Sequence, residues 1–211
     1  MKRNEKNIII DNVFTEQEIA DIYEVVNSAP ESNMYVQKTF SHRAYFIDLP
    51  ENVVNKIKSV VEKNYEEPVE LTEISFARYS YDMYRDGLSP VTPRLYPHRD
   101  DAFHEPRLTV DFQIKSNRDW PLVIEDREYT LKDNQALTFS GTHQIHWRPC
   151  VEWGEDDFID LIFTHFSQKD RVEKCLDADE EHQKEISSLQ NYYLELWNEK
   201  APSNQKTYNN E

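Results

Sequence analysis

Two histidines and one aspartate have the residue types and the spacing of a metal site. His98 and Asp100 are separated by one residue, so on an extended strand an imidazole and a carboxylate point to the same side. His146, further along the chain, supplies a second imidazole. Two histidines and one carboxylate on one face of a metal leave the opposite face open, which suits non-haem Fe(II) oxygen chemistry. The two cysteines form no Cys-x-x-Cys pair, so a closed thiolate zinc site is not available.

The third ligand has two candidates by spacing, His143 and His146. They are three residues apart, so on a continuous strand they face opposite ways and cannot bind the same metal ion. The remaining histidines stand in no comparable motif, and we expect ordinary surface or hydrogen-bonding roles for them. They are His42, His104, His165 and His182.

The motifs around these residues follow an order that resembles the Fe(II)/2-oxoglutarate-dependent dioxygenases, in particular their prolyl-4-hydroxylase-like branch. The segments that carry the resemblance are Tyr-Pro-His-Arg-Asp at 96–100, Arg-Leu-Thr-Val at 107–110, the stretch 137–146 with its Ser-Gly-Thr lead into the distal histidine, and the apolar stretch 158–166. The likeness is firm over the central third of the chain and looser over the N-terminal half. It favours His146 over His143 as the distal ligand.

The resemblance also implies the cofactor and the reaction. Fe(II) would be bound by His98, Asp100 and His146, 2-oxoglutarate would chelate the metal, and O2 would take the remaining position. Succinate and CO2 would be the products of the coupled decarboxylation. An aspartate ligand favours hydroxylation over halogenation, which in related enzymes needs that position vacant for a halide. The substrate, a peptide or a small molecule, is not readable from the sequence.

The sequence departs from this branch at the cation expected for the far carboxylate of 2-oxoglutarate. Members of the branch usually place an Arg or Lys on the last barrel strand, whereas residues 155–157 here are Glu-Asp-Asp. Arg148 shares the face of the distal histidine and is the first candidate, because a guanidinium binds a carboxylate through two parallel hydrogen bonds. Arg107, supported by Tyr96 or Thr109, is the second. A plain ion pair between Arg148 and a nearby acid is the alternative.

Two other functional classes fit the same residues. A cupin-like enzyme with the same ligands but without 2-oxoglutarate would explain the acidic stretch 155–157. A catalytically silent barrel that acts as a binding module would explain it too, but has little reason to keep the three ligands together. Tyr79 and Tyr81, on an expected strand, either pack with their hydroxyls at the surface or form a pocket wall.

The elements expected around the site are mainly β-strands with flanking helices. Residues 107–114 alternate apolar and polar side chains, which predicts a strand with one packed face and a polar face toward a ligand-holding interior. Short strands at regular spacing predict an antiparallel meander or jelly roll, and the resemblance implies that the strands at about 71–168 form a double-stranded β-helix, a jelly-roll or cupin-like barrel. Apolar stripes predict helices at 16–28, 51–64 and about 178–200, the first after a Thr-x-x-Glu capping box.

The helix at about 178–200 must bury its apolar face, either on the barrel or on a second copy in a homodimer. A length of 211 residues favours one domain, residues 1–200, followed by a polar and disordered tail at 201–211.

The formal charge of −16 at pH 7 repels polyanions, and no basic stripe interrupts it, which disfavours nucleic-acid binding. No segment has the apolar length of a signal sequence or a membrane span, so we expect no membrane association. The two cysteines lie far apart and give no disulfide framework, which favours a reducing cytoplasm.

Overall fold

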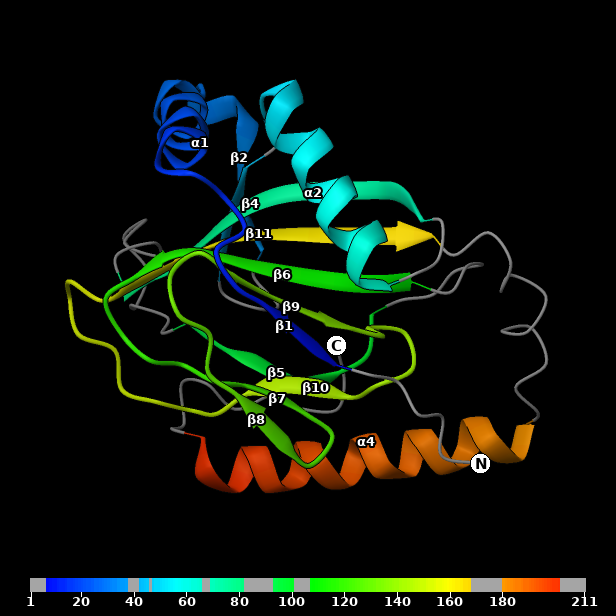
Figure 1. The fold of residues 1–211 in the computed structure, drawn as a ribbon. Helices are drawn as coiled ribbons and strands as arrows, with labels where there is room; N and C mark the ends of the chain where they lie inside the picture. The colour runs from blue at the N-terminus through cyan, green and yellow to red at the C-terminus, as the bar shows by residue number, and fades with distance from the viewer. Residues whose placement is uncertain are drawn as a thin grey trace.

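The candidate site residues lie on or directly beside two antiparallel β-sheets that face each other in the computed structural model (Figure 1). The structure describes residues 7–37, 42–45, 47–65, 69–81, 93–100, 107–167 and 180–201. His104 and residues 202–211 of the expected tail lie outside these ranges, as do the side chains of His42 and His182. The disorder expected for the tail therefore stays a prediction.

The larger sheet has the strand order β1-β9-β6-β11-β4-β3-β2. Its strands are β1 (Ile8–Ile10), β2 (Met34–Gln37), β3 (His42–Tyr45), β4 (Glu70–Ser80), β6 (Arg107–Ser116), β9 (Gln135–Phe139) and β11 (Phe158–Ser167). The smaller sheet has the order β5-β10-β7-β8. Its strands are β5 (Leu95–His98), β7 (Leu122–Ile124), β8 (Arg127–Tyr129) and β10 (His146–Arg148).

From β4 onward the chain crosses repeatedly between the two sheets, which is the connectivity of a double-stranded β-helix and confirms the predicted fold class. The two sheets do not close into a continuous barrel, because among the described residues they are two separate hydrogen-bonded ladders. At the edges of the larger sheet, β1 pairs with β9 and β2 with β3, so these strands extend that sheet instead of joining it to the smaller one.

Strand β6 shows the predicted alternation of apolar and polar faces. One face packs on the helices α1 (Glu16–Ser28) and α2 (Glu51–Tyr65) through Leu108, Val110, Phe112 and Ile114. The opposite face points between the sheets with Thr109, Asp111 and Gln113, all of which are buried. The polar interior expected from the sequence is therefore present.

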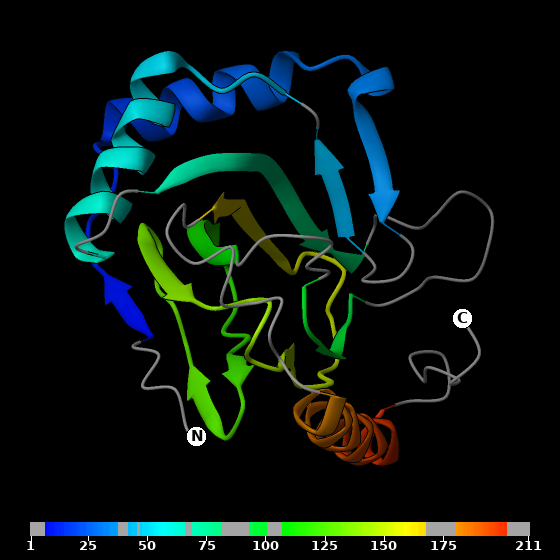
Figure 2. The same cartoon turned by 90° about the vertical axis from the view of Figure 1, so that its right-hand side faces the viewer.

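Helices α1 and α2 cover the outer face of the larger sheet (Figures 1 and 2). Helix α1 begins with the predicted capping box, in which Thr15 and Glu18 each accept a hydrogen bond from the other's backbone N–H. Tyr23 of this helix donates to Oδ2 of Asp160 on β11 at 2.7 Å. Arg78 of β4 donates to both oxygens of the same carboxylate at 2.6 Å. These contacts fix the helix to the middle of the sheet.

The C-terminal helix α4 (Glu180–Lys200) runs along the outer face of the smaller sheet (Figures 1 and 2). Trp197 is buried there, and its indole N–H donates to the carbonyl oxygen of Arg148 at 2.9 Å. The ring of Tyr193 lies 4.7 Å from that of Trp147 on β10. This part of the helix packs on the smaller sheet, whereas a homodimer stays a prediction. Among the described side chains of α4, the large apolar ones that remain exposed are Leu189, Tyr192 and Leu196.

Ala201, the first residue after α4, continues the hydrogen bonding of the helix. It is buried, and its N–H donates to the carbonyl oxygen of Trp197 at 2.9 Å. The expected tail therefore starts no earlier than residue 202. Among the described helices, none is long and apolar enough to cross a membrane.

Candidate metal centre

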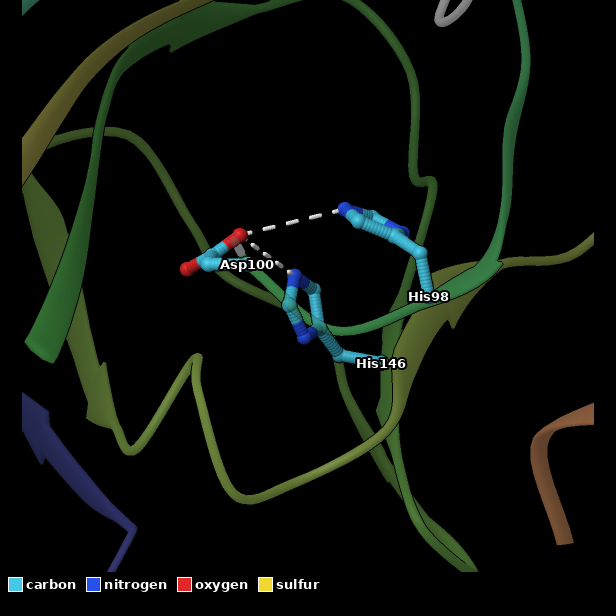
Figure 3. A group of neighbouring side chains, drawn as sticks. All are labelled: His98, Asp100 and His146. Carbon is cyan, nitrogen blue, oxygen red and sulfur yellow. Dashed lines mark ion pairs between the residues drawn. The ribbon is translucent and has the colours of Figure 1, made fainter. Parts of the chain in front are cut away.

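The predicted ligands lie on neighbouring strands of the smaller sheet and in the loop that follows. His98 ends β5 and His146 begins β10, and the two residues are direct partners in the ladder. Their ring centroids lie 4.3 Å apart. Asp100 follows β5 and turns its carboxylate toward both rings (Figure 3). The i, i+2 spacing of the sequence thus places an imidazole and a carboxylate together as predicted.

The potential ligand atoms of His98, Asp100 and His146 all lie within 4.8 Å of one another. Oδ1 of Asp100 is 3.5 Å from Nε2 of His146 and 3.9 Å from Nε2 of His98 (Figure 3). Nδ1 of each histidine faces a backbone carbonyl, that of Tyr96 at 2.8 Å and that of Gln144 at 3.1 Å. A proton on Nδ1 leaves the Nε2 lone pair toward the carboxylate. Two imidazole nitrogens and one carboxylate oxygen are a donor set that fits non-haem Fe(II).

The charges at the site also suit a cation. Burial and the neighbouring His146 lower the pKa of His98 to about 3, so this ring is neutral at physiological pH. Burial opposes ionisation of Asp100, but His146 and His165 outweigh it and hold the pKa of the carboxyl well below its usual range. Burial favours the neutral form of His146, but Asp100 outweighs it and raises the pKa of this ring. A neutral imidazole and an ionised carboxylate are the forms that bind metals, so metal binding would release the proton of His146.

Two groups hold Oδ2 of Asp100 on the side away from the ligand histidines. The hydroxyl of Thr109 donates to this oxygen at 2.5 Å. Nε2 of His165, on β11, lies 3.5 Å from it. The backbone N–H of Asp100 donates to the carbonyl oxygen of Gly141 at 2.9 Å, which fixes the loop itself.

Gly141 is required for this arrangement because the carboxylate occupies the place of a side chain. A Cβ added at Gly141 would lie 1.8 Å from Oδ2 of Asp100 and 2.2 Å from Oγ1 of Thr109. Both distances are far below a van der Waals contact, so no other residue fits without moving the aspartate. The Ser-Gly-Thr lead noted in the sequence thus has a steric function.

His143 does not take part in the group of potential ligands. Its Nδ1 lies 2.8 Å from the hydroxyl oxygen of Ser140, within the turn that precedes β10. Of the two candidates for the distal position, the structure brings His146 and not His143 to His98 and Asp100.

A buried cation, the guanidinium of Arg148, lies between the two sheets, two strand residues beyond the level of the candidate metal ligands. Thr109 lies beside the candidate metal ligands, because its hydroxyl donates a hydrogen bond to Asp100. Asp111 follows two residues later on β6, and Arg148 lies two residues after His146 on β10, a step of about 6–7 Å in each strand. Nη2 of Arg148 lies 3.9 Å from Oδ2 of Asp111.

The side chain of Arg148 is 2% exposed and is incompletely hydrogen-bonded. Nη1 donates to the carbonyl oxygen of Trp120, and the guanidinium lies 5.1 Å from the centre of the Trp120 ring. Nη2 has no hydrogen-bond partner among the described residues. Burial raises the pKa of Asp111 to about 6, although the guanidinium opposes this shift. The guanidinium therefore retains a donor for an additional anionic or polar group.

The other predicted contacts of the cosubstrate, Thr109, Tyr96 and Arg107, stay predictions. The hydroxyl of Thr109 donates to Asp100. Tyr96 accepts from His98 through its carbonyl oxygen, and its ring lies 5.9 Å from the imidazole, edge to face. Arg107 begins β6, but its side chain lies outside the described residues, so its role stays a prediction.

Tyr79 and Tyr81 are part of the packing between the sheets. Tyr79 is fully buried, hydroxyl included, with its ring edge-on to Trp120 at 5.0 Å and to Phe163 at 6.5 Å. Tyr81 is half-buried and packs against the same cluster. The surface position expected for the Tyr79 hydroxyl is thus not observed, and a pocket wall stays a prediction.

Among the described residues near the site, His165 is one that the sequence analysis did not identify. It was expected to have an ordinary role, yet it faces Asp100 from β11. The sequence did contain a signal for this position. On a strand, His165 shares a face with Leu161 and Phe163, and that face of the apolar strand points inward between the sheets.

Comparison with known proteins supports the fold. No family model matches the sequence, and no curated protein matches it either. Solved structures do match, among them 2-oxoglutarate–Fe(II) oxygenases, including prolyl hydroxylases. At these low sequence identities the likeness establishes a shared double-stranded β-helix.

Three of the similar structures are two prolyl hydroxylases and a protein named HygX. A viral collagen prolyl hydroxylase from Paramecium bursaria Chlorella virus-1, in complex with 2-oxoglutarate, has a TM-score of 0.53 at 12% identity, over 78% of this chain and 96% of the viral chain. A prolyl hydroxylase from Trichoplax adhaerens, in complex with a hypoxia-inducible-factor peptide, has a TM-score of 0.54 at 14% identity, over 82% of this chain and 87% of the Trichoplax chain. HygX from Streptomyces hygroscopicus, with nickel and 2-oxoglutarate bound, has a TM-score of 0.54 at 11% identity, over 77% of this chain and 83% of the HygX chain.

Proposed function

We propose that this chain is an Fe(II)- and 2-oxoglutarate-dependent dioxygenase that hydroxylates a peptide or small-molecule substrate. The observation that carries the proposal is the convergence of His98, Asp100 and His146 within 4.8 Å. The similar structures support the same reaction class, since they include 2-oxoglutarate complexes and a peptide complex.

The three side chains have separate tasks in this proposal. Nε2 of His98, Nε2 of His146 and Oδ1 of Asp100 would hold the metal, leaving one face open for cosubstrate and O2. Bound iron supplies the activation of O2 coupled to oxidative decarboxylation of 2-oxoglutarate. The Nδ1 hydrogen bonds of both histidines fix the ring orientation and raise the basicity of Nε2.

Arg148 would bind the far carboxylate of 2-oxoglutarate. It lies one strand step, about 6–7 Å, from the metal level, which suits a five-carbon chain whose keto end binds the metal. Its Nη2 has no hydrogen-bond partner among the described residues, and a charged donor in a buried setting binds a carboxylate strongly. In a protein with a net charge of −16, such a local cation is needed to attract a dianion.

An anaerobic titration with Fe(II) tests the proposed function. Addition of 2-oxoglutarate to the iron-loaded protein should produce a weak visible charge-transfer band, and admission of O2 should convert 2-oxoglutarate to succinate. Succinate without the protein or without iron would reveal a background reaction. An iron-loaded protein that shows no change on addition of 2-oxoglutarate would contradict the proposal.

A cupin-like enzyme with the same metal ligands but without 2-oxoglutarate is the second candidate. Two observations favour it, the first being that the inward positions in the N-terminal part of β11 carry Ile159, Leu161 and Phe163, where the related branch usually has a cation. Arg148 also has the acidic Asp111 beside it. Iron binding without any effect of 2-oxoglutarate on the spectrum would support this second function.

A further inference from the structure

His165 connects the surface of the larger sheet to the candidate metal centre. In β11 it pairs with Glu73 of β4 on one side and with Thr109 of β6 on the other. Nδ1 of its ring lies 3.0 Å from Oε2 of Glu73, and Nε2 lies 3.5 Å from Oδ2 of Asp100. The ring is mostly buried, with 18% of the side chain exposed, whereas 52% of the Glu73 side chain is exposed.

The two oxygens of Asp100 have different neighbours. Oδ1 faces the ligand histidines His98 and His146. Oδ2 faces Thr109, which donates at 2.5 Å, and the ring of His165. Turning the carboxylate so that both oxygens face the histidines would break the Thr109 hydrogen bond and separate Oδ2 from His165.

We infer that His165 is a positioning residue for the metal: together with Thr109 it retains Oδ2 of Asp100, so that the aspartate presents Oδ1 alone. Glu73 fixes the orientation of the His165 ring through its contact with Nδ1. The inference rests on the proposed function, because it concerns the same metal centre. A carboxylate that bound with both oxygens would occupy a position that cosubstrate or O2 needs.

Metal binding without turnover tests the inference. The loss of residues that orient metal ligands typically weakens metal affinity by about 10- to 100-fold. We therefore expect His165→Phe, which keeps the ring shape but removes both nitrogens, to weaken Mn(II) binding by about tenfold, read from the free Mn(II) signal in electron paramagnetic resonance. The visible spectrum of bound Co(II) should change as well, because its carboxylate ligand is no longer held in one orientation.

Two further variants separate orientation from general packing. His165→Gln retains an N–H donor that reaches toward Asp100, so it should recover part of the lost affinity and of the Co(II) spectrum. The matched control is His143→Phe, because His143 is also half-buried near the site but binds Ser140. This control should bind Mn(II) as the unmodified protein does.

The outcomes are distinguishable. If the unmodified protein binds neither Mn(II) nor Co(II), both the proposed function and the inference are wrong. If it binds them and His165→Phe keeps the same affinity and the same Co(II) spectrum, only the inference is wrong. Should His165→Phe fail to fold, Glu73→Ala decides, since the exposed Glu73 tolerates truncation. Weaker Mn(II) binding by Glu73→Ala supports the inference, and unchanged binding overturns it.

Discussion

Arg148 and Asp111 form a buried pair in which Nη2 of the guanidinium lies 3.9 Å from Oδ2 of the carboxylate. The distance is long for a hydrogen bond, and Nη2 has no hydrogen-bond partner among the described residues. Two buried ions that satisfy each other incompletely contribute little net stability. The incomplete pairing supports the proposal that Arg148 binds an additional anionic group.

Replacement of Arg148 should weaken cosubstrate binding without preventing metal binding. A charge-assisted contact of this kind contributes about 1.5–3 kcal/mol, so Arg148→Ala should raise the dissociation constant for 2-oxoglutarate by about ten- to a hundred-fold. Arg148→Lys should recover only part, because a point charge cannot make two parallel hydrogen bonds. Titration of the iron-loaded variants under anaerobic conditions measures both effects.

Arg118 offers a matched control for the Arg148 variants. It also pairs with an acid, Asp157 at 2.5 Å, and its guanidinium lies 4.4 Å from the centre of the Trp153 ring. Arg118→Ala should lower the melting temperature but leave 2-oxoglutarate affinity unchanged. If Arg148→Ala, Arg148→Lys and Arg118→Ala all bind 2-oxoglutarate with the same affinity, Arg107 becomes the candidate for the contact with its far carboxylate.

Gly141→Ala should abolish metal binding although Gly141 donates no ligand atom. The new methyl group would lie 1.8 Å from Oδ2 of Asp100, so the carboxylate must leave the position in which Oδ1 faces the histidines. Gly154→Ala is the control, because its methyl group would meet Asp157 at an ordinary 3.5 Å. Calorimetric titration with Co(II) compares the two. Normal Co(II) affinity in Gly141→Ala would show that Asp100 lies elsewhere in the working protein.

Each ligand substitution, His98→Ala, Asp100→Ala or His146→Ala, should abolish Fe(II) binding while the protein remains folded, since each removes one of the proposed ligands. His143→Ala should bind iron almost normally, because His143 lies outside the group. Iron content after anaerobic loading and gel filtration gives the answer, with circular dichroism as the check on folding. Loss of iron from His143→Ala together with retention by His146→Ala would reverse the assignment of the distal ligand.

Trp197→Ala should destabilise the protein by about 3–5 kcal/mol, because it removes a buried aromatic side chain from the interface of α4 with the smaller sheet. Tyr192→Ala, on the same helix, should change the free energy of unfolding by no more than about 0.5 kcal/mol, since that side chain is 55% exposed. Urea denaturation measures both. Similar losses would indicate that Tyr192 is buried in solution, and a shift in sedimentation on its replacement would identify a dimer.

Truncation tests the boundary of the same helix. Removal of residues 202–211 should leave solubility and sedimentation unchanged, whereas removal of everything from residue 178 onward should expose the outer face of the smaller sheet. The shorter protein should aggregate or unfold at a lower temperature. Ala201 must be kept in the first truncation because it is buried against the end of α4.

Local patterns were sufficient for the elements and for the pair His98 and Asp100. Side chains two residues apart share a face of any strand, and the alternation at 107–114 likewise follows from strand geometry alone. The capping box at Thr15 and Glu18 is equally local. Each of these features depends on backbone geometry over a few residues, and that geometry is the same in every fold.

The amino-acid sequence by itself therefore determined the strands, the helices and the set of candidate ligands, and its resemblance to a known family implied the double-stranded β-helix. Only the tertiary structure decided which side chains meet across strands. Pairing of β11 with β6 and β4 brings His165 between Glu73 and Asp100, and the loop before β10 leaves no room for a side chain at Gly141. The two sheets also remain open at their edges. These features depend on strand register and on contacts between distant segments, which no local periodicity specifies.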